Sequence, residues 1–180
     1  MSSFNNPKVM LLVDGYNIIG SWSGLKQTRD RYGLEFARQE LIEALINYSA
    51  FQGYSTDVVF DSQYRQTPNQ IEKFSALVSA HYTAFNQTAD TYIEKLCAQF
   101  HRQINSPRII VATSDRVQQL TVVGYGAEWI SAPRLEGEVY LTTKSKRNQR
   151  PQKKSQGRFL FNTLDAKTQQ RLVQMRTGKS

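Results

Sequence analysis

The chain has 180 residues, of which 39% are hydrophobic and 21% are charged. That size and composition suit one globular domain with a buried core. No apolar run is long enough to cross a bilayer, and the N-terminal segment lacks the charged and apolar zones of a secretory signal. The single cysteine, Cys97, excludes an internal disulfide and a thiolate zinc cluster. We therefore expect a cytoplasmic protein with no membrane partner.

The formal net charge of +8 is unevenly distributed along the chain. Residues 1–133 carry 11 Lys and Arg against 12 Asp and Glu, whereas residues 134–180 carry 12 against 3. A near-neutral body with a cationic tail predicts a polyanionic partner, usually nucleic acid. A tail that serves only solubility is the alternative that composition leaves open.

Hydrophobic periodicity predicts the elements in chain order. The first part predicts a strand at residues 8–13, a loop rich in Gly, Ser and charge at 20–33, a helix at 34–52, a strand at 55–61 and a loop at 62–70. Residues 71–87 predict an early helical turn and then a strand over about 78–85. The remainder predicts a helix capped by Thr88 at 88–105, a strand at 108–115, a short helix at 116–126, a strand at 127–131 and a helix at 133–145. A basic linker at 144–158 precedes a final amphipathic helix at 161–178.

This alternation of strands and helices predicts an α/β fold. A parallel sheet of about five strands would be covered by helices on both faces, with right-handed crossovers. We expect one domain over residues 1–145, followed by the basic linker and C-terminal helix over residues 146–180. The carboxyl ends of parallel strands lie along one edge of such a sheet, and ligands bind there.

Three of the predicted strands end in an aspartate, namely Asp14, Asp61 and Asp115. A fourth acid, Asp90, lies at the start of a predicted helix, where the topology directs it toward the same edge. Clustered carboxylates raise one another's pKa, so the fold needs something that offsets their repulsion. A bound divalent cation would do so.

The candidate ligands are oxygen atoms, which favour Mg²⁺ or Mn²⁺ over zinc. Such an ion activates water and neutralises phosphate oxygens, so the acids predict phosphoryl-transfer chemistry. Each acid alone has a simpler explanation. Asp61 and Asp115 could be turn residues or helix caps, Asp90 could suit the helix dipole, and Asn17 could be a turn residue. Their concurrence at one edge favours a metal site.

The motifs LLVDGYNIIG, VVFD, TAD…IEKL and VATSD together resemble the YacP-like family of NYN domains, within the PIN-like group of metal-dependent ribonucleases. The resemblance covers nearly the whole chain. It implies a three-layer, Rossmann-like fold and endonucleolytic cleavage of RNA with one or two Mg²⁺ or Mn²⁺ ions. It also implies that Asp14 is a primary metal ligand and that Asp90 and Asp115 complete the site. Asp61 matches the acid after the second strand, and Asn17 would orient Asp14 or a metal water.

The chain also departs from the family pattern. Gln87 stands where an acid is common, and Thr91 and Tyr92 stand where charged residues are usual, while Glu94 is kept. The missing acid weakens the expectation of a second ion. The basic stretch is richer than the family needs. Its expected contacts with RNA phosphates are Lys144, Lys146, Arg147, Arg150, Lys153, Lys154 and Arg158.

The sequence therefore predicts a metal-dependent endoribonuclease that acts on RNA, in mRNA or other RNA processing or decay. Ribosome association is a further expectation. Two alternatives stay open. The same acids could serve a phosphohydrolase or a DNA nuclease, or the protein could bind RNA or the ribosome without catalysis.

Overall fold

The computed structural model describes residues 8–62 and 70–149, with side chains as far as Ser145. The chain divides into two units, residues 1–145 and 146–180. The fold described below is that of the first unit. The final helix predicted at 161–178 lies outside the described residues, as does most of the basic linker.

A six-stranded sheet forms the middle layer of the unit. Its strand order is β3-β4-β2-β1-β5-β6, and the strands are β1 (Val9–Asp14), β2 (Ser55–Phe60), β3 (Gln70–Lys73), β4 (Val78–Tyr82), β5 (Arg108–Ala112) and β6 (Glu128–Ile130). Neighbouring strands run parallel except for β3, which is antiparallel to β4. The strand order reverses at β1, which pairs with β2 on one side and β5 on the other. This reversal is where doubly wound sheets bind ligands.

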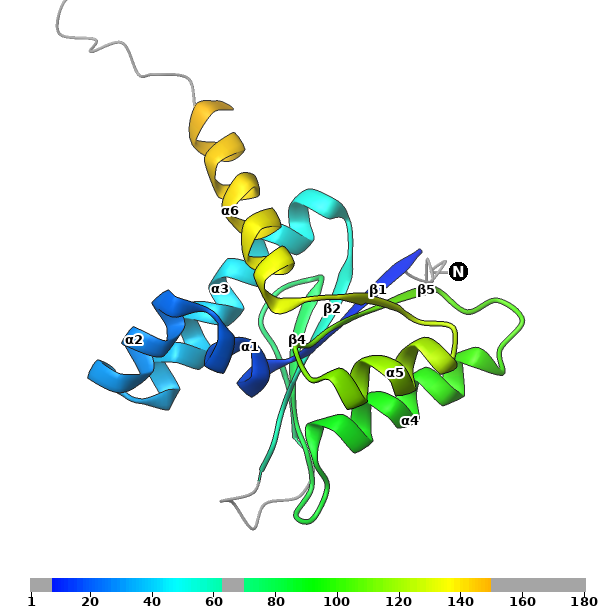
Figure 1. Ribbon diagram of the computed structural model, residues 1–180. Helices are drawn as coiled ribbons and strands as arrows, with labels where there is room; N and C mark the ends of the chain where they lie inside the picture. The colour runs from blue at the N-terminus through cyan, green and yellow to red at the C-terminus, as the bar shows by residue number, and fades with distance from the viewer. Residues whose placement is uncertain (1–7, 63–69, 150–180) are drawn as a thin grey trace, which may run out of the picture. The chain divides into compact units, whose positions relative to one another are not determined.

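Helices cover both faces of the sheet (Figure 1). They are α1 (Gly15–Ser21), α2 (Ser23–Tyr32), α3 (Leu34–Gln52), α4 (Ala89–His101), α5 (Arg116–Gly124) and α6 (Ala132–Gln149). The strands alternate their side chains between the two layers, so Leu11 and Val13 pack with α1, α2, α3 and the first part of α6. Leu12 and Val111 face α4 and α5 on the other side. The predicted three-layer α/β/α fold is confirmed.

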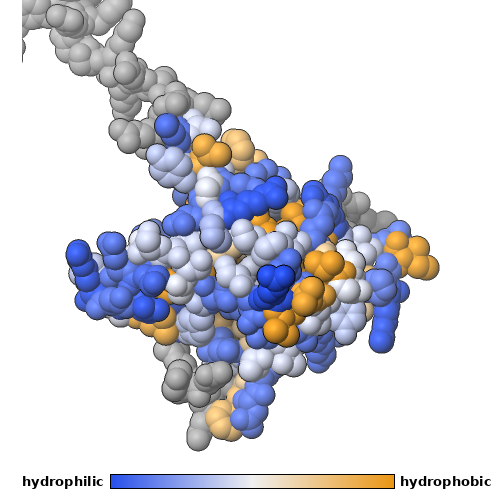
Figure 2. Space-filling model, in the orientation of Figure 1, coloured by the Kyte–Doolittle hydropathy of each residue, from blue (hydrophilic) through white to orange (hydrophobic). Residues whose placement is uncertain are grey.

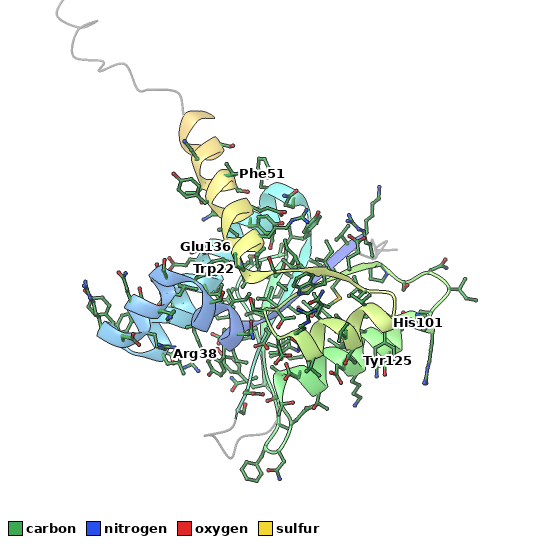
Figure 3. The ribbon with its side chains drawn as sticks, in the orientation of Figure 1. Trp22, Arg38, Phe51, His101, Tyr125 and Glu136 are labelled. Atoms are coloured by element: carbon green, nitrogen blue, oxygen red, sulfur yellow. The ribbon has the colours of Figure 1, made fainter. Side chains whose placement is uncertain are left out.

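The loop prediction for residues 20–33 is wrong, because this segment contains the end of α1 and all of α2. The Gly, Ser and charged residues of this segment are typical of a loop, but Ile18, Trp22 and Leu25 form a buried stripe. The Trp22 indole Nε1 donates a hydrogen bond of 2.8 Å to the carbonyl of Ala132, which ties this segment to the start of α6 (Figure 3).

The helical turn predicted at the start of 71–87 is also wrong. Residues 70–73 form the edge strand β3, which pairs with β4 as a hairpin and makes the sheet six strands wide instead of five. All four of its residues are exposed, so its sequence lacks the alternation of apolar and polar residues that marks a half-buried strand. Of the loop predicted at 62–70, residues 63–69 lie outside the described part.

The remaining elements follow the prediction closely. The helix over 34–52 is α3, and Thr88 caps α4 by accepting a hydrogen bond from the Thr91 N–H. Cys97 is buried against the sheet. None of the described helices is long and apolar enough to span a membrane.

The outer face of α5 is apolar. Val117, Leu120 and Val123 are each at least half exposed, and Figure 2 shows apolar side chains gathered over this helix. The helix therefore buries one side against the sheet and presents an apolar stripe to solvent.

Candidate active site

Asp14 lies at the carboxyl end of the central strand β1 and also caps α1. Its side chain accepts a hydrogen bond of 3.2 Å from the Asn17 N–H, which orients the carboxylate at the helix start. The residue is only 8% exposed. The strand thus delivers a buried carboxylate to the point where the strand order reverses.

Gly15 allows the chain to turn directly from β1 into α1. A Cβ atom at this position would collide with the ring of Phe60, the last residue of β2. The ring therefore packs directly against the backbone that follows Asp14. This close approach explains why a glycine follows the aspartate in the VDGYN motif.

Asp61 and Asp90 meet Asp14 from the neighbouring strand and from α4. Asp61 follows β2, and its carboxylate accepts a hydrogen bond from the Ala89 N–H at the start of α4. Asp90 is the next residue of that helix, and its carboxylate is hydrogen-bonded to that of Asp14. Three acids that are distant in sequence therefore lie together.

Asp115 reaches the same edge from β5 and caps α5. Its carboxylate accepts hydrogen bonds from the Val117 and Gln118 N–H groups, at 2.7 and 3.1 Å. Burial raises the pKa of Asp90, and the charge of Asp115 raises it further. The four predicted acids are thus brought to one edge of the sheet, and we call Asp14, Asp61, Asp90 and Asp115 the acidic rim.

Asn17 joins two sides of the acidic rim. Its backbone N–H donates to Asp14, and its side-chain Oδ1 accepts a hydrogen bond of 2.7 Å from the Ser114 N–H. Ser114 belongs to the turn that places Asp115. Asn17 lies within α1 and not in a simple turn, and it fixes the spacing between the β1 and β5 ends.

Burial and mutual repulsion raise the pKa values within the acidic rim. Burial raises the pKa of Asp14 to about 7, against the lowering effect of the Asn17 N–H, and the charges of Asp90 and Asp61 raise it further. Burial is also the main reason why the pKa values of Asp61 and Asp90 lie above their ordinary range. Asp14 therefore keeps its proton to a higher pH than an exposed aspartate does.

The rim residues fit a divalent ion by their chemistry. Among the described side chains, no group of three or more His, Cys, Asp or Glu is placed so that it could hold a metal ion. Asp61 and Asp115 instead satisfy helix N-termini, and Asp14 pairs with Asp90. All the candidate donors are carboxylate oxygens, the ligand type that suits Mg²⁺ or Mn²⁺.

The uncharged residues after Asp90 have structural roles. The Tyr92 hydroxyl lies 2.8 Å from Nδ1 of His81, and the other ring nitrogen of His81 lies 3.4 Å from the Asp57 carboxylate. Thr91 takes part in the cap of α4. These contacts engage both ring nitrogens of His81.

The predicted RNA contacts lie largely outside the described side chains. Lys144 is exposed on α6, while Lys146 and Arg147 lie in the same helix, where only the backbone is described. The contacts predicted from Arg150 to Arg158 lie beyond the described residues. The structure also reveals a cation that the sequence analysis missed, Arg38 of α3, which contacts residues next to the acidic rim. The sequence feature that could have indicated Arg38 is its place as a charged residue between the apolar positions Ala37 and Leu41, which are both buried.

A groove of about 410 Å³ lies at the opposite edge of the sheet, where β5 and β6 begin. His101 and Tyr125, labelled in Figure 3, line it together with the exposed ion pair of Arg108 and Glu128. None of the predicted site residues lies there.

The sequence and the fold both match known proteins. The sequence matches the YacP-like NYN domain over residues 11–177. It is 39% identical over 136 residues to the protein YacP of Bacillus subtilis (strain 168). The aligned region covers 72% of this chain and 74% of that protein. A crystal structure of Rae1 (YacP) from Bacillus subtilis superposes with a TM-score of 0.67 at 32% identity, covering 94% of this chain and 95% of that one. A mutant of the same protein gives a TM-score of 0.64 at 30% identity, over 91% and 98% of the two chains.

Proposed function

The chain belongs to the YacP-like NYN domain family of PIN-like nuclease domains, and on that basis we propose that it is a metal-dependent endoribonuclease. The proposed substrate is RNA, with an mRNA as the expected form and the ribosome as an expected site of action. The proposed location is the cytoplasm.

One observation carries this proposal. Four carboxylates from separate elements gather at the point where the strand order reverses, and burial raises the pKa of the central one, Asp14, to about 7. Repulsion among these carboxylates destabilises the fold unless a bound cation offsets it. Perturbed carboxylates at this position of an α/β sheet are typical of a catalytic site.

The residues have distinct roles in the proposed reaction. Asp14, Asp90 and Asp115 would hold Mg²⁺ or Mn²⁺, which when bound supplies water activation and neutralises charge on the phosphodiester. Asn17 keeps Asp14 in place and ties it to the turn before Asp115. Asp61, whose pKa is raised by burial, is suited to accept a proton.

The test is a Mg²⁺-dependent RNA cleavage assay that compares the wild type with Asp14→Asn and Asp90→Asn. We expect each substitution to reduce cleavage by at least about a hundredfold, because each removes charge that the transition state requires. Asp30→Asn, on the exposed surface of α2, is the matched control and should cleave like the wild type. DNA of the same sequence is assayed in parallel.

The outcomes separate the alternatives. Equal cleavage by all the variants would reject the proposed site. Efficient cleavage of DNA in preference to RNA would point to the DNA nuclease, and a trapped phospho-enzyme would point to a phosphohydrolase with a nucleophilic aspartate. RNA binding without Mg²⁺-dependent cleavage would leave a non-catalytic RNA-binding protein.

A further inference from the structure

Arg38 brings a positive charge toward the acidic rim from α3, a helix that contributes none of the four acids. Its Nη1 donates a hydrogen bond of 2.9 Å to the hydroxyl of Tyr16, which lies two residues after Asp14. Its guanidinium carbon is 5.9 Å from the ring centre of Phe60 and 5.8 Å from that of Tyr82. Figure 3 shows Arg38 beside α1 and α3. We call Tyr16, Phe60 and Tyr82 the aromatic cradle.

The cradle holds the guanidinium in a fixed place. The Tyr16 and Phe60 rings are 5.2 Å apart, and the Phe60 and Tyr82 rings stack at 5.6 Å. The Arg38 side chain is only 11% exposed. A guanidinium positioned in this way loses little conformational freedom when it binds an anion.

The positive charge of Arg38 is only loosely neutralised. The carboxylate that pairs with it in the described part of the chain is that of Glu35, which contacts Nη2 and is 71% exposed. The Arg38 Nε atom is buried and has no hydrogen-bond partner among the described residues. A partly buried cation favours a close anion, whereas an ion pair with an exposed partner is weakened by solvent. Another anion could therefore replace Glu35.

The position of Arg38 suggests which anion this is. Phe60 precedes Asp61 and Tyr16 follows Asp14, so the cradle borders the acidic rim on its α1 and α3 side. An RNA backbone that reaches the rim brings negative phosphates toward four carboxylates and needs a cation nearby. The planar guanidinium fork matches the two free oxygens of a phosphodiester.

We infer that Arg38 binds an RNA backbone phosphate next to the one that is cleaved, and that Glu35 occupies the guanidinium until RNA replaces it. This inference rests on the proposed endoribonuclease function, since it assigns a substrate contact to the same site. It makes Arg38 a substrate-binding residue and Glu35 an internal competitor of the substrate.

The test measures binding of a fluorescent single-stranded RNA across a range of salt concentrations, in EDTA so that the RNA stays intact. We expect Arg38→Gln to weaken binding about tenfold, the value of one charge-assisted contact. The slope of log affinity against log salt should become shallower by about 0.7. Glu35→Gln should instead tighten binding several-fold. Arg108→Gln, which removes an ion-paired arginine at the opposite edge of the sheet, should leave binding unchanged.

Two further measurements keep the inference open to refutation. The melting temperature of each variant identifies binding lost through unfolding, and Glu35→Gln tests the same contact without altering the buried cation. If Glu35→Gln and a folded Arg38→Gln both bind RNA like the wild type, Arg38 has only a packing role and the inference is wrong. The same changes should appear with DNA, because a phosphate contact does not read the 2′-hydroxyl. A loss confined to RNA would contradict the phosphate assignment.

Failure of the inference can be told apart from failure of the proposed function. If the wild type cleaves RNA in Mg²⁺ while binding is unaffected by either substitution, the function stands and the role of Arg38 falls. If the predicted binding changes occur in a protein that cleaves nothing, the phosphate contact stands and the nuclease proposal falls.

Discussion

Asp14 combines two roles that are usually separate. It caps α1, as a buried aspartate at a helix start commonly does. It is also hydrogen-bonded to a second carboxylate and has a pKa near neutrality. A cap alone requires neither feature, whereas the proposed role as a metal ligand accounts for both.

The raised pKa of Asp14 predicts how stability depends on pH when no metal is bound. The folded-state pKa of about 7 lies above the ordinary value of 3.8, so the unfolded chain releases this proton first as pH rises. The contribution of protonated Asp14 is therefore complete below about pH 4 and is lost as pH rises to about 7. At about pH 8 the loss is on the order of 4 kcal/mol of unfolding free energy.

Urea denaturation in EDTA at about pH 5 and about pH 8 measures this effect. Asp14→Asn removes the titrating group, so its stability should fall less between the two pH values than that of the wild type. Parallel pH profiles for the two proteins would show that the Asp14 carboxyl is not perturbed.

At the scale of elements, the strand ends and helix starts could be predicted because their acids follow long apolar runs. α1 and α2 could not, because Gly20, Ser21 and Ser23 mark a loop in sequence while Ile18, Trp22 and Leu25 are buried only once α3 and α6 are present. The same limit applies to Arg38, whose contacts come from three other elements.

The start of α5 offers a way to separate capping from ligand chemistry. Asn caps helices about as well as Asp, whereas Ala does not. We expect Asp115→Asn to keep the stability of the wild type and to lose most RNA cleavage. Asp115→Ala should lose the same activity and also about 1 kcal/mol of unfolding free energy, because the Val117 and Gln118 N–H groups lose their acceptor.

Cleavage rates and urea denaturation of both variants, each measured against the wild type, decide the matter. If Asp115→Asn cleaves RNA as fast as the wild type, the residue is a cap and nothing more.

At the scale of the whole chain, the alternation of strands and helices was enough to predict a three-layer α/β fold and the edge at which the acids meet. Edge strand β3 escaped prediction because it is exposed on all four residues and carries no periodic signal. The convergence of Asp14 and Asp90 followed from topology, but the raised pKa of Asp14 depends on burial, which sequence alone does not reveal.

The separation of charge along the chain predicts that the basic tail contributes to RNA affinity through phosphates. Replacing Lys153, Lys154 and Arg158 together by Gln should make the slope of log affinity against log salt shallower by about 2, at about 0.7 for each lost contact. The same protein should cleave saturating RNA at the wild-type rate, because the acids are unchanged. An unchanged slope would indicate a tail that serves only solubility.

The central claim, that the acidic rim is a divalent-ion site, is tested most directly by calorimetric titration of the metal-free protein with Mn²⁺. We predict saturable binding by the wild type, an affinity at least about tenfold weaker in Asp14→Asn and Asp90→Asn, and wild-type binding in Asp30→Asn. Equal Mn²⁺ binding by all four proteins, or binding by none of them, would contradict the account.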